Sequence, residues 1–407
     1  MKIAVIGSGI SGLSAAYFLS KNHNVDLYEQ NDHFGGHSYT YDIKEEDKIV
    51  SVDLGFIVFN ELTYPNLINF FNELNVPFEK SNMSFSVSIK KTNIEYGGSG
   101  LSAVFANKLN LFNFDFLKMI KEIINFYKYA PSLLNNIKEE TLGGYLEKSK
   151  LSKYFIEYHI IPMVAAIWSM PFSKAKDMPL KLFLKFFINH GLFRLNNRPQ
   201  WYTVTNRSRT YVKKILEKVS GEIYKNYKIN NISRSNDNVR ISIGNEYLDY
   251  DHVVLACHAD QSLNILDDPT IKEQEILNKF TYVRNKAFLH TDVNLMPVKK
   301  KAWSSWNSIT KDKKTCITYW LNKLQSLKTD KDYFLTLNPV EEIKETKIIK
   351  ECQFTHPYFN NENVRLQKDL HLLQGRKRTW FCGSYFGYGF HEDGLKSSIE
   401  LIKNFKT

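Results

Sequence analysis

Apolar residues follow two different spacings along this chain, and together they predict strands that alternate with helices. Residues 3–6 and 25–28 form short continuous apolar runs, which are typical of strands buried on both faces. Residues 13–19 lie between them with helical spacing. Near the other end, residues 379–382 repeat the strand pattern and residues 395–405 the helical one. The pattern predicts an α/β fold that contains a parallel sheet.

A glycine-rich turn joins the first strand to the first helix. Its sequence is Gly7-Ser8-Gly9-Ile10-Ser11-Gly12. In such a turn the first glycine makes the bend, the second lets a pyrophosphate approach the backbone, and the third lets helix and strand pack closely. The amino terminus of the helix offers free N–H groups to phosphates. Glu29 ends the second strand, where an acid can accept hydrogen bonds from ribose hydroxyls.

Strand, turn, helix, strand and acid in this order predict a dinucleotide-binding site. A structural turn without a ligand is the alternative interpretation. The residues expected to contact the dinucleotide are Gly7, Gly9, Ile10, Ser11, Gly12, Glu29 and Gln30.

A second glycine turn follows the acid and indicates which dinucleotide is bound. Its sequence is Phe34-Gly35-Gly36-His37-Ser38. It resembles the FAD-binding variant of this fold, in which Gly-Gly and a basic residue continue the diphosphate cradle. A plain surface turn is the alternative. We expect Gly36, His37 and Ser38 to contact FAD, with backbone N–H groups forming an anion-binding nest.

The carboxyl-terminal region carries a third glycine-rich turn between a strand and a helix. It runs from Gly383 to Gly394. A helix amino terminus there offers N–H groups to the N1–C2=O edge of a flavin, which gains negative charge on reduction. We therefore expect both ends of the chain to build one cofactor cradle. The residues expected to bind in this part are Gly383, Ser384, Asp393, Gly394 and Leu395.

The middle of the chain predicts a second domain that interrupts the first. We expect helices over residues 62–75, 111–134 and 208–219, and short strands from Ile223 to Tyr247 that form an antiparallel meander. The expected division is FAD-binding parts at 1–60, 196–265 (with the meander) and 376–407, a mainly helical substrate or cap region at 61–195, and the β part of the substrate domain at 266–375.

Charge and composition change the picture of the partners. The chain has 407 residues and a formal net charge of +11, which suits an anionic partner. Segments 111–134 and 180–195 mix phenylalanine and leucine with lysine, as interfacial helices on an anionic membrane do, although ordinary core faces are the alternative. We expect a lipid surface or hydrophobic small molecule and no nucleic acid.

The spacing of the cysteines and the length of the longest apolar stretch indicate the cellular compartment that we expect. The four cysteines are far apart, so no disulfide framework and no metal site are expected. The longest apolar stretch, residues 159–172, is too short to span a bilayer. The apolar start of the chain belongs to the first strand rather than to a signal peptide. We expect a cytoplasmic protein that can lie on the inner face of the cytoplasmic membrane.

Four motifs together resemble one family. They are Gly36-His37-Ser38-Tyr39-Thr40, the segment from Asp53 to Asn60, the segment from Ala256 to Gln261, and the segment from Gly387 to Gly394. With them the chain, from Met1 to about Lys403, resembles bacterial FAD-dependent oxidoreductases of the amine oxidase and phytoene desaturase superfamily. The most similar group is usually described only as predicted NAD/FAD-binding proteins, and it is associated with enzymes that methylate or cyclopropanate fatty acyl chains.

The resemblance implies a fold and further contacts. It implies an FAD-binding Rossmann domain of the two-dinucleotide-fold type with an inserted α+β substrate domain. Gly55 and Phe56 would pass near the flavin ring, and Ile229 would lie near the adenine. His37 stands where relatives usually have arginine, Ser384 where many have an acid, and Asn206-Arg207 where the group tends to have Gly-Gly.

The resemblance implies an acyl-chain substrate and leaves alternatives open. An unsaturated or methyl-branched fatty acyl chain of membrane lipid would be desaturated, reduced or isomerised, next to a fatty acyl methyltransferase partner. A flavin amine oxidase is the second hypothesis, with an aromatic cage from Tyr385, Tyr388, Trp303 and Trp306. A non-catalytic flavin-binding partner protein is the third.

One histidine is the first candidate for proton transfer. His391 lies in the last glycine-rich turn beside the expected flavin edge, and an unperturbed histidine titrates near neutral pH. It is expected to act as a base or, protonated, to stabilise reduced flavin, whereas a structural histidine is the alternative. Tyr388 and Glu392 are the other catalytic candidates.

Overall fold

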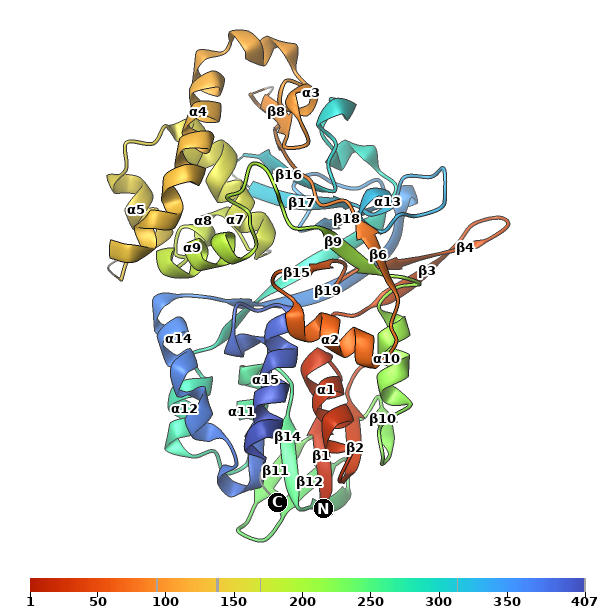
Figure 1. Cartoon of the computed structure of the whole chain (residues 1–407). Helices are drawn as coiled ribbons and strands as arrows, with labels where there is room; N and C mark the ends of the chain where they lie inside the picture. The colour runs from red at the N-terminus through yellow and green to blue at the C-terminus, as the bar shows by residue number, and fades with distance from the viewer. Residues whose placement is uncertain (93, 137–138, 169, 313, 406–407) are drawn as a thin grey trace.

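The computed structural model describes residues 1–92, 94–136, 139–168, 170–312 and 314–405. Figure 1 shows two regions, one above the other, with both termini at the lower end of the lower region. The lower region holds the parallel sheet, and the upper region holds a large mixed sheet flanked by helices. The predicted α/β fold with an inserted α+β domain is confirmed.

The lower sheet has five strands, and every neighbouring pair in it is parallel. Their order is β10 (Ile223–Lys225), β2 (Asn24–Glu29), β1 (Lys2–Ile6), β14 (His252–Leu255) and β20 (Thr379–Phe381). The central strands are buried on both faces, which explains their continuous apolar runs. Three distant segments of the chain thus supply one sheet.

Helices from both ends of the chain pack together beside this sheet. They are α1 (Ile10–Leu19) and α15 (His391–Asn404), and α10 (Arg209–Leu216) lies next to α1. The Ser14 and Ser398 hydroxyls form a buried hydrogen bond of 2.6 Å between α1 and α15. Small side chains on both helices permit this close approach, so the two ends form one structural unit.

The predicted meander is smaller than expected. It contains β11 (Asn231–Arg234), β12 (Val239–Ile243) and β13 (Glu246–Tyr250), paired antiparallel. The prediction that Ile223 belongs to it is wrong, because β10 pairs in parallel with β2 at the edge of the lower sheet. Arg234 attaches the meander to α12 (Ile271–Leu277) through a buried ion pair with Glu273 of 2.7 Å.

The upper sheet combines strands from two expected regions. Its order is β19 (Ile348–Tyr358), β15 (Thr281–His290), β18 (Phe334–Leu337), β17 (Lys314–Trp320), β16 (Trp306–Lys311), β7 (Phe85–Ile89) and β8 (Ile94–Gly97). Only β16 and β7 pair in parallel within this described sheet. Residues 61–195 and 266–375 therefore share one sheet.

Short strands and one helix connect the two regions. The hairpin β3 (Thr40–Lys44) and β4 (Ile49–Asp53) precedes β5 (Phe59–Asn60), which with β9 (Trp201–Val204) and β6 (Phe78–Ser81) forms a small sheet. Helix α2 (Pro65–Glu73) crosses above α1 and α15. The segment around Phe56 thus lies between the two regions.

The helical part of the upper region has its own apolar core. It contains α3 (Leu101–Val104), α4 (Phe114–Tyr129), α5 (Leu142–Lys148), α7 (Ile161–Ile167), α8 (Phe172–Ala175) and α9 (Leu180–Asn189). The apolar residues of α9 are buried, so the prediction of an interfacial helix over 180–195 is wrong. Within the described residues, no helix combines the length and apolar character that crossing a bilayer requires.

Candidate functional site

The first glycine turn divides into positions that the fold needs and one that it leaves open. Gly7 has a φ of +100°, which favours glycine, and a side-chain carbon at Gly12 would lie 1.8 Å from the Gly7 carbonyl oxygen. Gly9 differs, because its φ of −63° suits any residue and, apart from its chain neighbours, no residue has an atom within 4 Å of where its side chain would begin. The space at Gly9 is therefore free for a close-approaching ligand.

The second glycine turn packs directly on the first. The Gly35 N–H donates to the Ser8 carbonyl at 3.0 Å. A side-chain carbon at Gly36 would lie 3.1 Å from the Gly9 Cα. The two turns therefore present adjacent backbone at one place, as a shared diphosphate cradle requires.

The acid at the end of β2 lies beside the first turn. One Glu29 oxygen accepts from the Ser8 N–H at 3.0 Å and the Ser8 hydroxyl at 2.6 Å, and the other accepts from Asn31. Ribose hydroxyls would therefore exchange with these donors. Gln30 is exposed, and Ile229 is buried in the core under the meander.

The last glycine-rich turn meets the first helix. A side-chain carbon at Gly394 would lie 2.7 Å from the Ser11 Oγ and 2.9 Å from the Ile10 Cγ2. The predicted start of this helix at residue 395 is wrong, because α15 begins at His391. The N–H of Leu395 is therefore inside the helix, and the first-turn N–H groups belong to residues 391–393.

His391 joins this turn to two other segments. Its Nε2 lies 2.9 Å from the Ser38 Oγ and 3.0 Å from the Tyr211 hydroxyl, and those two hydroxyls also bond to each other. Its ring stacks on Phe56 with centroids 3.7 Å apart. Gly55 supports this arrangement, since a side-chain carbon there would lie 2.1 Å from the His37 carbonyl oxygen.

Burial lowers the pKa of His391 well below its usual value, because an imidazolium would lose its hydration there. Burial therefore favours the neutral imidazole at pH 7, and the role of His391 as a cation beside reduced flavin stays a prediction. Tyr211, which contacts it, was missed by sequence reasoning because a tyrosine in a helix has no distinguishing local signal.

The two acids after His391 have structural partners. The Glu392 carboxylate accepts from the Asn66 N–H and the Leu67 N–H at 3.0 Å each, and so caps α2. Asp393 accepts from the Phe390 N–H at 2.9 Å at the start of its own helix, and burial raises its pKa to about 6. These contacts give Glu392 a helix-capping role, and its catalytic role stays a prediction.

Three further histidines gather near the second glycine turn. The rings of His37 and His356 lie 5.2 Å apart, and His258 stacks on Tyr282 at 4.1 Å. Burial lowers the pKa of His37 and His258 to about 4 and that of His356 to about 3. His37 is therefore uncharged at neutral pH, unlike the arginine of relatives.

Two buried polar atoms in the glycine-rich segments have no hydrogen-bond partner among the residues that the structure describes. They are the Nε2 of His37 and the hydroxyl of Tyr385. An unpaired buried polar group is costly, so such atoms commonly mark a place that a ligand satisfies. Together with the open backbone at Gly9, they fit a bound dinucleotide.

The aromatic cage proposed for an amine substrate is not assembled. Tyr385 packs on Phe280, whereas Trp303 packs on Trp320 and Phe334, and Trp306 packs on Tyr319. Tyr388 alone faces the helical core, with its ring 5.9 Å from that of Phe186. Burial raises the pKa of the Tyr388 hydroxyl, so it is protonated at neutral pH.

Asn206 and Arg207, which stand where the resembled group tends to have Gly-Gly, adopt the left-handed backbone conformation that favours glycine. Asn206 and Arg207 have φ values of 60° and 77°. The Arg207 guanidinium donates to the Ser51 and Gln325 carbonyl oxygens at 2.8 and 2.9 Å. The side chain therefore ties the turn before α10 to β4 and to Gln325.

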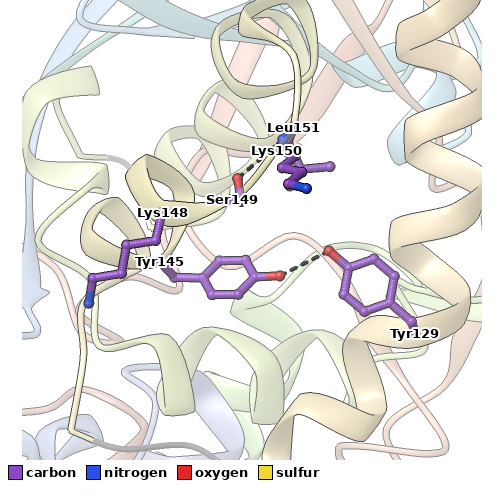
Figure 2. A pocket seen from close by; sticks show the side chains of 6 residues that line it. All are labelled: Tyr129, Tyr145, Lys148, Ser149, Lys150 and Leu151. Carbon is purple, nitrogen blue, oxygen red and sulfur yellow. Dashed lines mark hydrogen bonds between the residues drawn. The ribbon is translucent and has the colours of Figure 1, made fainter.

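A separate pocket lies at the outer side of the helical part. Figure 2 shows it between the end of α4 and α5, where the hydroxyls of Tyr129 and Tyr145 bond at 2.9 Å. None of the predicted site residues lines it. It is therefore distinct from the site at His391.

Comparison with known proteins agrees with this architecture. Residues 5–74 match the family described as NAD(P)-binding Rossmann-like domain. No curated protein sequence matches the chain. The fold predicted from the resemblance is the one that solved structures share.

Three solved structures illustrate the similarity. A CLA-producing fatty acid isomerase from P. acnes is 14% identical with a TM-score of 0.68, over 100% of this chain and 98% of that one. Cyclohexylamine oxidase from Brevibacterium oxydans IH-35A is 13% identical with a TM-score of 0.70, over 100% and 99%. A putative protoporphyrinogen oxidase from Exiguobacterium sp. 255-15 is 14% identical with a TM-score of 0.69, over 99% and 98%.

The chain therefore shares its fold with these solved structures, two oxidases and a fatty acid isomerase. The Rossmann-like match covers both amino-terminal glycine turns and fits the predicted dinucleotide cofactor.

Proposed function

We propose that this protein is an FAD-dependent oxidoreductase that acts on a hydrophobic substrate, an unsaturated or methyl-branched fatty acyl chain. The single observation that carries the proposal is the position of His391. It lies where the glycine-rich ends of the chain meet, and Phe390 next to it faces the aromatic core of the helical region. This position joins a dinucleotide cradle to an apolar surface.

Several residues would hold the cofactor. The backbones of Gly9 and Gly36 would face the diphosphate, and Glu29 would bind ribose hydroxyls after exchange with Ser8. The N–H groups at the start of α15 would face the flavin. FAD supplies hydride transfer to or from carbon, which the side chains of proteins cannot perform.

Among the residues that the structure describes, the substrate side is aromatic, and its nearby carboxylates have partners. Phe186 stacks on Phe390 with centroids 4.9 Å apart, and Trp168 lies 4.6 Å from Phe186. The nearby carboxylates of Glu392 and Asp393 are engaged in helix caps. An ammonium group would therefore lose its hydration without gaining a partner, whereas an acyl chain loses none. This favours a lipid over an amine.

His391 has a defined chemical role in this proposal. Its neutral Nε2 shares a proton network with the Ser38 and Tyr211 hydroxyls, so a proton can be held or passed among three atoms. A neutral imidazole with a lowered pKa is a weak base. His391 therefore orients the reacting chain and shuttles a proton without carrying a lasting positive charge. Stacking on Phe56 holds the ring in place.

The experiment is an anaerobic assay of the flavin-loaded protein against a panel of lipids and amines. Flavin absorbance reports net hydride transfer, and lipid mass spectrometry with chromatography reports double-bond migration, which leaves the flavin oxidised overall. We expect a change in the lipid or in the flavin with unsaturated or methyl-branched acyl chains. Reduction by amines alone would establish an amine oxidase. No reaction with either class would favour a non-catalytic flavin-binding protein.

The substrate class also implies a neighbouring reaction. Methylation of an unsaturated acyl chain is one reaction that supplies a methyl-branched chain, so we propose a fatty acyl methyltransferase as a partner. Co-purification of the two proteins from cells tests this. Acyl-chain turnover that needs no methyl branch, with no co-purification, would contradict it.

A further inference from the structure

Large apolar side chains are exposed together at the far end of the helical region. They form what we call the apolar tip, which consists of Leu101, Leu109, Leu111, Phe112, Phe114 and Leu117. Phe112 is 83% exposed and Phe114 is 88% exposed. Figure 1 places α3 and the first turn of α4 at the top of the molecule, opposite the termini.

The fold does not use these side chains. The buried face of α4 consists of other residues, Phe116, Met119, Ile123 and Phe126, which pack in the helical core. Phe112 and Phe114 lie outside that stripe and face away from it. Soluble surfaces rarely expose apolar side chains of this size in one contiguous group, so the group indicates a partner.

Side-chain hydrogen bonds hold the backbone of the apolar tip in a defined conformation. The Asn107 side chain accepts from the Leu109 N–H at 3.2 Å at the start of the 3₁₀ helix Lys108–Phe112. The Asn113 side chain accepts from the Phe116 N–H at 3.1 Å at the start of α4. These two caps fix the backbone on both sides of Phe112, so the apolar side chains are presented outward.

Positive charge accompanies the tip. Lys108, Lys118 and Lys121 are exposed, and none of them forms an ion pair within the part of the chain that the structure describes. The one exposed acid among them is Asp115. Apolar insertion beside unpaired lysines complements a bilayer with anionic head groups.

We propose that the apolar tip inserts into the interface of an anionic phospholipid bilayer and holds the protein on its surface. Phe112 and Phe114 enter between the head groups, and the three lysines lie on the phosphates. The proposal does not depend on the proposed chemistry, because binding is read without turnover. It places the membrane contact on the 101–121 segment and excludes α9, whose apolar face is buried.

The test uses the full-length protein and vesicles of phosphatidylcholine alone or mixed with phosphatidylglycerol, separated by flotation. We expect binding to the mixed vesicles that falls as salt rises. The double variant Phe112→Ser/Phe114→Ser should bind about 100-fold more weakly, since each phenylalanine transferred from water favours insertion by about tenfold. Ile271→Ser is the matched control, because Ile271 is 76% exposed but lies on α12, far from the tip.

Each other outcome overturns the proposal. Equal absence of binding to both vesicle types would do so, as would unchanged binding of the double variant. Concentration-dependent self-association that the double variant abolishes, without vesicle binding, would assign the tip to a second copy of the chain. FAD content of the variants, measured in parallel, should equal that of the wild type, so a failure here is separate from a failure of the proposed function.

Discussion

Replacing Gly9 by valine separates what a ligand requires from what the fold requires. The backbone at Gly9 has φ −63° and ψ 177°, which valine adopts without strain, and apart from the chain neighbours no residue has an atom within 4 Å of the added carbon. The free energy of unfolding should therefore change by no more than about 0.5–1 kcal/mol. The added methyl groups fill the space through which a diphosphate would reach the backbone.

The matched variant is Gly12→Ala, in which the same turn receives a smaller side chain. The added carbon would lie 1.8 Å from the Gly7 carbonyl oxygen, less than the 3.4 Å of ordinary contact. Backbone must move by well over an ångström, so we expect a loss of stability of about 1–3 kcal/mol or more. This loss arises in the fold and needs no cofactor.

Two measurements distinguish the variants: urea unfolding and titration with FAD followed by flavin fluorescence. Gly9→Val should unfold at nearly the wild-type urea concentration but bind FAD at least 100-fold more weakly, which is about 2.7 kcal/mol. Gly12→Ala should unfold at a lower urea concentration. Wild-type FAD affinity in Gly9→Val would refute the placement of the diphosphate, and unfolding of that variant would refute the open space.

Three further outcomes follow from the geometry. His391→Ala should retain FAD but slow turnover by about 10²–10⁴-fold, as loss of general acid–base help does, and turnover at the wild-type rate would remove this role. Glu392→Ala should lower the free energy of unfolding by about 1–2 kcal/mol, because α2 loses its cap, and unchanged stability with lost turnover would restore a catalytic role. Burial lowers the pKa values of His37, His258 and His356, so between about pH 4 and 6.5 the unfolded chain binds more protons than the folded one. The free energy of unfolding should therefore be highest above pH 6.5. At pH 5 it should be lower by roughly 2 kcal/mol per histidine. Urea unfolding at pH 5 and pH 7 measures this difference. Equal free energies of unfolding at the two pH values would contradict the burial of these histidines in the neutral form.

The cofactor cradle could be predicted from the sequence because its parts are neighbours along the chain. The turn from Gly7 to Gly12 needs only a strand, a bend and a helix that are adjacent along the chain. The meeting of the two ends could also be anticipated, since both carry the same strand–turn–helix pattern. In the structure the two ends meet where Gly394 packs against Ile10.

Contacts between distant segments could not be predicted in this way. Glu392 caps a helix that lies more than three hundred residues earlier in the chain, and no nearby residue indicates it. Tyr211 reaches His391 only because α10 packs beside α1. β10 looked like part of the meander because a short edge strand has the same alternation in either sheet.

The charge of a histidine also depends on surroundings that a sequence does not show. His391 was expected to titrate near neutral pH, whereas burial on Phe56 keeps it neutral. Similarly, the mixed phenylalanine and lysine pattern occurs in two segments with opposite fates. The apolar residues of α9 are buried in the helical core, whereas Phe114 at the start of α4 lies outside that core and is exposed.

The central claim is that the two glycine-rich ends of this chain bind FAD. The most direct measurement is the flavin content of the purified full-length protein, with FAD added back by titration. We expect one FAD per chain, released intact by acid precipitation, and no comparable binding of NAD. Protein without flavin absorbance that takes up no FAD, or that binds NAD in its place, would contradict it.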